Sequence, residues 1–376
     1  MTAVIKAKNP ADMLALMPAL LGFTPKQSVV LLPFRGNRAY GAMRLDLPGS
    51  GPPAVHKRLA TYIVGTLCKL RGVDSVVLVV VTDAKFGAQS TPPSSDLVKT
   101  LRARFRQSGL GLKEALCLAS DGWGSYLDDD TPAGGRPLSD VTNSAVTGAV
   151  PPEARREVDA SARESRVPNA PPAEVQRVKE KFDRLRRRVD EADDDDHHVP
   201  REFEALQDVP NLMEAALEWN DEEIASGAAL LLFAWQGPPL RDMTMLQWAT
   251  EMSVGDLILD ENESMIRSDP TAPSKTHQFL GGLMMGIGPR PDPDRIERGI
   301  RLVRAVVARA EDEQRVAPLC MLTWLCWALG HGSEAGRYLD EAASIRPDYG
   351  MVEVLSAILG NGMMPEWAFS SYGPAL

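Results

Sequence analysis

The chain has 376 residues, of which 44% are apolar and 24% are charged, and its formal net charge is −10. This length allows two or three domains with sizeable cores, and the composition is that of a globular protein rather than a disordered or fibrous one. No apolar run reaches the roughly 18 residues that a membrane span requires, so we expect no membrane-embedded segment.

The cysteines indicate a reducing compartment. Cys68, Cys117, Cys320 and Cys326 lie in apolar sequence without CxxC spacing, which is typical of small core residues rather than of disulfides or metal ligands. The first residues contain no apolar stretch of the kind found in secretory signals. We therefore expect a cytoplasmic protein.

The charge is unevenly distributed along the chain. Residues 1–150 contain 17 Lys and Arg against 11 Asp and Glu, a net charge of +6, whereas the remaining residues carry a net charge of −16. This asymmetry suggests two units with different surfaces, of which the positive one could meet an anion. The excess is mild, so we do not expect nucleic acid as a partner.

The first 150 residues alternate strand and helix patterns. A hairpin is expected at Gly36-Asn37, where the backbone can take positive φ, and the segment "VDSVVLVVVTD" is typical of a strand buried on both faces. The expected elements are, in chain order, strands 27–34 and 40–47, helix 55–71, strand 73–83, helix 95–106 and strand 112–121. Helices between apolar strands predict an α/β domain with a mixed sheet.

A linker and a charged helix are expected over residues 151–200. The segment "VPNAPP" is linker-like, and the residues after it place five apolar side chains on one helical stripe between ion-pairing positions. The run "EADDDDHH" (191–198) offers metal-ligand types, but adjacent side chains on a helix point apart and like charges repel. We interpret it as a solvated helix end.

Residues 201–376 show only helical patterns and are expected to form an all-α domain. Within it, Ala335, Leu339, Ala342 and Pro347 have the spacing of the second helix of a tetratricopeptide repeat. Small side chains let two antiparallel helices approach closely, and proline ends the second helix. Because one copy is visible, an ordinary helical hairpin remains an alternative to a peptide-binding groove.

Several segments in order resemble a known family. They are "NPADMLALMPALLGFTPKQSVVLL", "RLDLP", "VVVTD", "GWGSY", "LRDM" and "GHGSEAGRYLDEAASIRPDY", and together they resemble an actinobacterial family named domain of unknown function 4192. The resemblance extends from Asn9 to Trp367 and implies a cytosolic protein of actinobacteria or their bacteriophages, without an established activity. Members often carry cysteines after "GWGSY"; this chain has "LDDDTPAGG" there, so a metal or redox role for such cysteines is not expected.

Isolated carboxylates follow the predicted strands of the α/β domain. Asp83 and Asp121 each end a strand pattern, and Arg44 and Asp46 lie near the end of another. Since ligands of open α/β sheets gather at the carboxyl ends of strands, these residues could hold Mg²⁺ and clamp a phosphate. The alternative is that the aspartates close turns and that Arg44 and Asp46 are exposed neighbours.

Trp123 and Ser125 in "GWGSYL" could line the same ligand pocket. The serine lacks the second glycine of a nucleophile elbow, and no histidine is placed to serve as its base, so a serine hydrolase is not expected. The glycine-rich "FLGGLMMGIGPRP" has no Gly-Lys-Ser/Thr and follows no strand, so it is not a phosphate loop.

Three residues of the helical domain are candidate contacts with another domain or a partner, namely Arg241, Asp242 and Tyr338. In "GPPLRDM", Asp242 is expected to cap the start of a helix. Burial of Arg241 would cost free energy unless the paired arginine holds neighbouring groups in a fixed arrangement.

Three functional hypotheses follow from these patterns. The first is a non-enzymatic interaction or regulatory protein that binds a protein partner through its helical domain. The second is a divalent-metal-dependent enzyme, or a binder of a phosphorylated small molecule, at the strand ends. The third is a structural or assembly component of a phage. No cofactor is evident apart from the Mg²⁺ of the second hypothesis, and the oligomeric state stays open.

Overall fold

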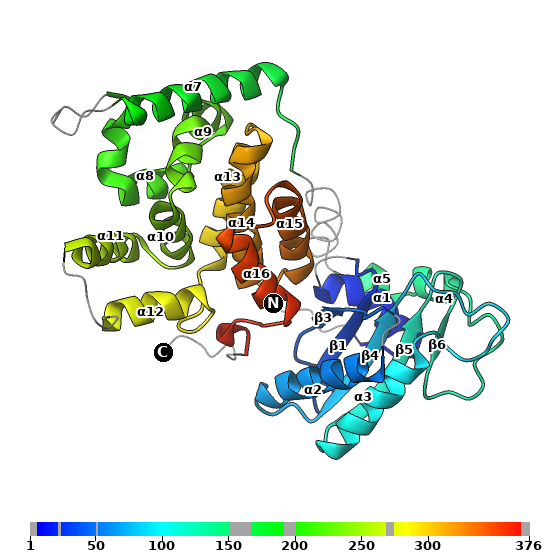
Figure 1. Cartoon of the computed structure of the whole chain (residues 1–376). Helices are drawn as coiled ribbons and strands as arrows, with labels where there is room; N and C mark the ends of the chain where they lie inside the picture. Colours follow the sequence, from blue (N-terminus) through cyan, green and yellow to red (C-terminus); the bar gives the residue numbers. More distant parts are fainter. Residues whose placement is uncertain are drawn as a thin grey trace. The chain divides into compact units, whose positions relative to one another are not determined.

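A computed structural model of the chain describes residues 6–21, 24–49, 52–150, 167–191, 201–267 and 274–369. Its contacts divide the chain into two compact units, Met1–Ser165 with Gly373–Leu376, and Arg166–Tyr372. We call them the α/β unit and the helical unit (Figure 1). Most of the expected linker and nearly all of the acidic run, residues 151–166 and 192–198, lie outside the described residues.

The α/β unit is built from short strands and helices. In chain order they are α1 (Pro10–Leu21), β1 (Ser28–Arg35), β2 (Arg38–Ala39), β3 (Met43–Asp46), α2 (Pro53–Lys69), β4 (Ser75–Val81), α3 (Ser95–Gln107), β5 (Gly111–Leu118), β6 (Trp123–Ser125), α4 (Ser139–Thr142) and α5 (Val146–Ala149).

The strands form one six-stranded mixed sheet, which confirms the predicted fold of this part. Its order is β2-β1-β4-β5-β6, with β3 also paired to β1. β4 and β5 are parallel, whereas β1 runs antiparallel to β4 and β6 runs antiparallel to β5. The predicted hairpin is present as β1 with β2 and β3, and Gly36 in its turn has a φ of +56°. Every residue of β4 is buried, as its continuous apolar sequence predicts.

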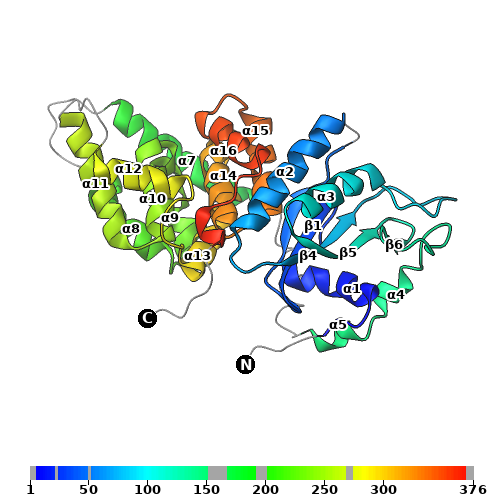
Figure 2. The same cartoon turned by 90° about the horizontal axis from the view of Figure 1, so that it is seen from below.

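Helices cover both faces of the sheet. α2 and α3 lie on one face, and α1, α4 and α5 lie on the other (Figure 2). Beneath α1, the side chains of Leu14 and Met17 pack with Val30, Val77 and Leu116 from three strands. α1, α2 and α3 each bury several apolar side chains, whereas α4 has no buried residue.

The helical unit consists of helices that follow one another with short connections. They are α7 (Pro172–Asp190), η1 (Arg201–Asp208), α8 (Val209–Ala216), α9 (Asp221–Gln236), α10 (Pro238–Ala249), α11 (Met252–Arg267), α12 (Lys275–Met284), α13 (Pro293–Val307), α14 (Asp312–Ala328), α15 (Gly332–Ile345), α16 (Gly350–Gly360) and η2 (Glu366–Phe369). The prediction that this part of the chain is helical is confirmed.

α14 is the central helix of this unit. It is surrounded by α9, α10, α13, α15 and α16, and most of its side chains are buried. The charged helix α7 packs on α9 through its buried Val178, Phe182 and Leu185, so its apolar stripe faces the helical core. In the described part of the chain, no helix is long and apolar enough to cross a lipid bilayer.

Candidate functional site

The predicted strand-end residues lie at one end of the sheet, where β4 and β5 finish. β4 and β5 are parallel, so Asp83 and Asp121 both follow strands that finish at this end. β1 begins there, and its Ser28 pairs with Val81 on one side and with Asp46 on the other. The topology therefore places Arg44, Asp46, Asp83 and Asp121 at the same end of the sheet.

Arg44 is held by neighbours on its own strand pair. Its Nε donates to Ser28 Oγ at 2.7 Å, and its Nη2 lies 2.5 Å from Asp46 Oδ1. The guanidinium is mostly buried, whereas the Asp46 side chain is 84% exposed. The Nε and Nη2 groups of Arg44 are therefore already bound within the β1–β3 pair and the residues beside it.

Asp121 closes a loop. Its Oδ1 accepts the backbone N–H of Phe86 at 2.9 Å, and its Oδ2 accepts that of Gly87 at 3.1 Å. These two bonds, with the one from Phe86 contributing most, hold the pKa of Asp121 below its ordinary value. Across the residues that the structure describes, no group of three or more His, Cys, Asp and Glu side chains is arranged to hold a metal ion.

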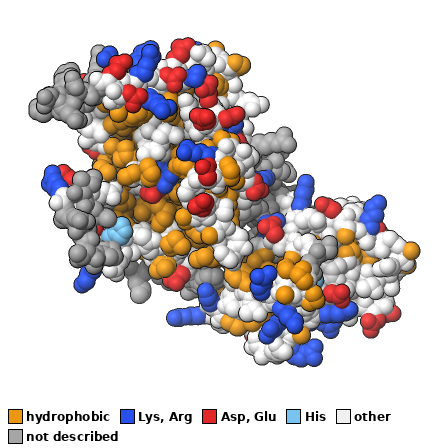
Figure 3. All heavy atoms as spheres, in the orientation of Figure 1, with side chains coloured by type: hydrophobic (Ala, Val, Ile, Leu, Met, Phe, Trp, Pro, Cys, Tyr) orange, Lys and Arg blue, Asp and Glu red, His pale blue; other side chains and the backbone are white. Residues whose placement is uncertain are grey.

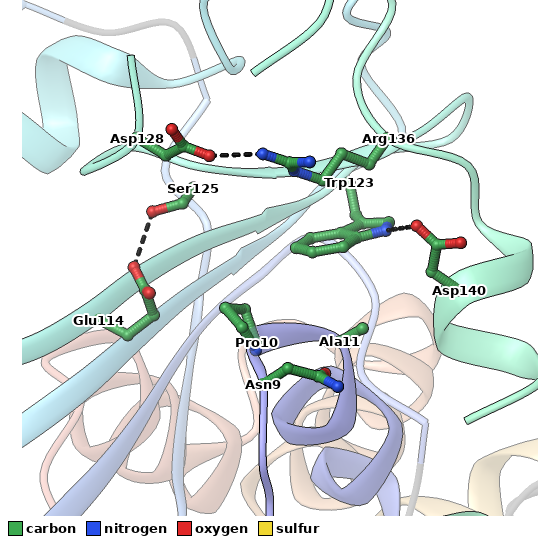
Figure 4. A pocket seen from close by; sticks show the side chains of 9 residues that line it. All are labelled: Asn9, Pro10, Ala11, Glu114, Trp123, Ser125, Asp128, Arg136 and Asp140. Atoms are coloured by element: carbon green, nitrogen blue, oxygen red, sulfur yellow. Dashed lines mark hydrogen bonds and ion pairs between the residues drawn. The ribbon is translucent and has the colours of Figure 1, made fainter. Parts of the chain in front are cut away.

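Trp123 and Ser125 line an open pocket of about 680 Å³ on the α1 side of the sheet (Figure 4). β6 brings both residues beside β5, because Leu116 pairs with Ser125 and Leu118 pairs with Trp123. The full lining is Asn9, Pro10, Ala11, Glu114, Trp123, Ser125, Asp128, Arg136 and Asp140.

Hydrogen bonds fix the polar groups of this Trp123 pocket. Ser125 Oγ donates to Glu114 Oε1 at 2.7 Å, and the indole N–H of Trp123 donates to Asp140 Oδ2 at 3.3 Å. Arg136 lies over the Trp123 ring, with Cζ 5.6 Å from the ring centroid, and forms a 2.5 Å ion pair with Asp128 (Figure 4). Three carboxylates and one guanidinium line the pocket, so its charge is negative.

The sequence patterns did not indicate the acidic members of this pocket. Glu114 follows Lys113 inside a predicted strand, where a charged residue by itself does not indicate a site. Asp128, Arg136 and Asp140 come from the connection after β6, and only the pairing of β5 with β6 and the Trp123–Arg136 bridge brings them near Glu114. The one available signal was the aromatic residue in a glycine-rich turn.

Two of the candidate contact residues of the helical unit, Arg241 and Tyr338, are buried, whereas the Asp242 side chain is 40% exposed. Arg241 is 5% exposed; its Nη1 donates to the Tyr349 hydroxyl at 2.5 Å and its Nε donates to Asp242 Oδ1 at 2.8 Å. Tyr338 is 1% exposed, with its hydroxyl 3.3 Å from Glu334 Oε1. The expectation that Asp242 caps a helix is wrong, because α10 already begins at Pro238 and Asp242 lies inside it.

Exposed apolar side chains gather at the end of α12. Phe279, Met285, Ile287 and Met363, which we call the apolar patch, are all exposed. Their segments adjoin, since Gly282 contacts Ile287, and the N–H of Glu366 donates to the carbonyl of Gly286 at 2.7 Å. On the face of the helical unit that Figure 3 draws, apolar side chains are widespread.

Comparison with curated proteins found no match, and comparison with solved structures found none either. A family model described as "Domain of unknown function (DUF4192)" matches residues 10–256 and 291–366, which span both units. The chain therefore belongs to this family.

Proposed function

We propose that the protein is an interaction protein whose helical unit binds a protein partner through the apolar patch. The observation that carries this proposal is that four exposed apolar side chains lie on adjoining segments. Among the described residues nine large apolar side chains are exposed, and four of them belong to the patch. Single exposed apolar residues are ordinary, whereas grouped ones mark interaction surfaces.

The backbone beneath the patch is fixed before any partner arrives. Trp324 donates its indole N–H to the carbonyl of Met284 at 2.8 Å, and Trp327 donates to that of Met363 at 2.7 Å. A Cβ at Gly286 would lie 2.7 Å from Trp327, so the chain packs there as closely as glycine allows. A preorganised backbone reduces the entropy lost on binding, and the two methionines can adapt to the surface they meet.

The helix pair that resembled a tetratricopeptide repeat supports a scaffold role. α14 and α15 pack together, and both Ala335 and Ala342 are fully buried between neighbouring helices. Small side chains at such positions allow close packing of antiparallel helices. We propose that this pair holds the patch on a rigid framework rather than forming the binding surface itself.

Two matched variants test the proposal. Ile287→Ser changes the patch, and Val189→Ser on α7 is the control, because the two side chains are 51% and 52% exposed. A photo-crosslinking residue at position 279 of the full chain, expressed in its own cells, identifies the partner, which is then purified. We expect Ile287→Ser to raise the Kd at least about tenfold, as expected for a central interface residue, and the control to leave it unchanged.

Equal affinity of both variants for the purified partner would overturn the proposal. Mass photometry of the chain alone distinguishes this proposal from the phage-assembly hypothesis. A symmetric oligomer that Ile287→Ser dissociates would favour assembly, whereas a monomer would favour a different protein as partner.

A second candidate function is the binding of a small organic cation in the Trp123 pocket. Glu114 and Asp140 receive hydrogen bonds from Ser125, Ala115 and Trp123, yet neither carboxylate forms an ion pair in the described part of the chain. An ammonium group would supply the missing charge, whereas a phosphorylated ligand would be repelled.

A thermal-shift screen with diamines, basic amino acids, nucleotides and Mg²⁺ compares these ligand classes. A bound ligand stabilises by about 2.7 kcal/mol at a hundredfold excess over its Kd. We expect an amine to raise the Tm, Glu114→Gln to abolish the rise, and Asp129→Asn, outside the pocket, to keep it. A rise with Mg²⁺ that Asp83→Asn removes would instead favour the strand-end metal site.

A further inference from the structure

The positive charge of the α/β unit is concentrated on two helices. α2 and α3 carry seven Lys and Arg residues and one acidic residue, Asp96. Their net charge of +6 equals that of the whole segment 1–150. We call the seven cations the basic face: Lys57, Arg58, Lys69, Lys99, Arg102, Arg104 and Arg106.

Packing forces these cations outward on one side of the sheet. Ala60, Ile63 and Leu67 of α2 and Leu101 and Phe105 of α3 are buried against the sheet and the neighbouring helix. The cations occupy the remaining positions and are exposed. Because both helices cover the same face of the sheet, their outer sides form one surface (Figure 2). Lys and Arg side chains are prominent over α2 and α3 (Figure 3).

Little of the positive charge of α3 is neutralised on that helix itself. Asp96 lies 3.1 Å from Lys99, but both side chains are more than two-thirds exposed, and such exposed pairs contribute little. Arg102 donates to the carbonyl of Tyr126, and Arg104 donates to the side-chain oxygen of Gln107, which are neutral acceptors. The face therefore keeps a concentrated positive potential.

The kind of partner follows from what the face lacks. No large apolar side chain of α2 or α3 is among the exposed ones of the described chain. A membrane-binding helix needs apolar residues to insert, a protein interface is rich in aromatic residues and poor in Lys, and a single-strand binder stacks bases on aromatic rings. A face that is rich in cations and has no exposed large apolar side chain matches the phosphate backbone of a duplex.

We propose that the basic face binds the backbone of double-stranded nucleic acid without reading its sequence. Lys and Arg that neutralise phosphates release condensed counterions, which drives such binding and makes it depend on salt. The averaged charge of the sequence argued against nucleic acid as a partner, but the fold gathers the whole excess onto one surface. This inference does not depend on the apolar patch of the helical unit, so either can fail alone.

Fluorescence anisotropy with the full-length chain tests the proposal. The probes are labelled DNA and RNA duplexes of one sequence and the matching single strands, titrated over a range of salt concentrations. We expect the duplexes to bind with a Kd of about 10⁻⁴–10⁻⁶ M at physiological salt and more tightly at lower salt. DNA and RNA duplexes share the phosphate backbone, so comparing their Kd values shows which of the two the basic face prefers.

Arg102→Gln/Arg106→Gln removes two cations that lie one helical turn apart. We expect it to weaken duplex binding at least tenfold and to reduce the slope of log K against log salt by about 1.8, since each phosphate contact contributes about 0.9. The control, Arg184→Gln/Arg188→Gln, removes two exposed cations of the same spacing from α7 and should change neither value.

Three results would overturn the proposal. They are the absence of duplex binding at low salt, equal effects of the two double variants, and tighter binding to single strands or to phosphatidylserine vesicles than to the duplexes. Thermal unfolding checks that both variants fold, as exposed substitutions should allow.

Discussion

The hydroxyl of Ser144 donates a 2.6 Å hydrogen bond to Oδ1 of Asp12, which lies 132 positions earlier in the chain. Both side chains are buried, and the other carboxylate oxygen accepts the backbone N–H of Lys8 at 2.8 Å. The bond from Ser144 is the main reason that the pKa of Asp12 is lowered, although burial opposes the shift. This contact joins the start of α1 to the chain just before α5.

We expect Ser144→Ala to lower the free energy of unfolding by about 1–3 kcal/mol at pH 7, because a buried carboxylate loses a donor. Asp12 has a lower pKa folded than unfolded, so its stabilisation is present above the ordinary value of 3.8 and is lost as the pH falls through the folded pKa. Urea unfolding at several pH values should show that the difference in unfolding free energy between the variant and the native protein shrinks as the pH falls through the folded pKa of Asp12. A deficit independent of pH would contradict this assignment.

The two strand-end aspartates should respond differently to truncation. Asp121 accepts hydrogen bonds from the N–H groups of Phe86 and Gly87, so Asp121→Ala should loosen the loop of residues 84–87 and let trypsin cleave more readily after Lys85, which is already exposed. Asp83→Ala is the matched control, since Asp83 donates its backbone N–H to Gln27 Oε1 and the substitution keeps this hydrogen bond. We expect faster cleavage after Lys85 and a lower Tm in the first variant, and neither change in the second. Equal cleavage rates would show that Asp121 does not hold the loop.

Much of the α/β unit could be predicted because its signals are local. The apolar run Ser75–Val81 specifies a strand buried on both faces, and Gly36-Asn37 specifies a turn. The location of Asp83 and Asp121 at the same end of the sheet could also be predicted, because both residues follow strands that were expected to end there. Local patterns could not show that the carboxylate of Asp121 would be used by two backbone donors of a distant loop.

The Trp123 pocket and the apolar patch depend on contacts between segments that are distant in the sequence. Glu114 and Ser125 meet because β6 returns antiparallel beside β5, a pairing that no short pattern encodes. In "FLGGLMMGIG", buried and exposed apolar residues look alike, and only the packing of Trp327 on Gly286 decides that Met285 and Ile287 face outward. The error at Asp242 has a similar cause, since Pro238 starts the helix earlier than the capping pattern suggested.

The four cysteines should differ sharply in reactivity. Cys68 is exposed, whereas Cys117, Cys320 and Cys326 are buried. Burial raises the pKa of Cys117 and of Cys320 to about 12 and raises that of Cys326 well above its ordinary value. Because the thiolate is the reactive form, a disulfide reagent at pH 8 should titrate one thiol quickly in the native protein and four in urea. Cys68→Ser should remove the fast phase, and a second fast thiol would contradict the burial.

Two glycine substitutions should change stability in opposite directions. Gly65 lies inside α2 with open space where a Cβ would stand, so Gly65→Ala should stabilise by about 1 kcal/mol through helix propensity. Gly299 lies inside α13, where a Cβ would stand 2.7 Å from Trp248, a fully buried ring whose N–H donates to Met213 at 2.9 Å.

The same propensity gain applies to Gly299→Ala, but the ring cannot move without breaking its hydrogen bond and its edge contact with Trp235. Overpacking of this kind costs about 1–3 kcal/mol, so the clash should exceed the gain and leave a net destabilisation. Urea unfolding followed by tryptophan fluorescence measures both changes. If Gly299→Ala were as stabilising as Gly65→Ala, the close contact between α13 and Trp248 would be refuted.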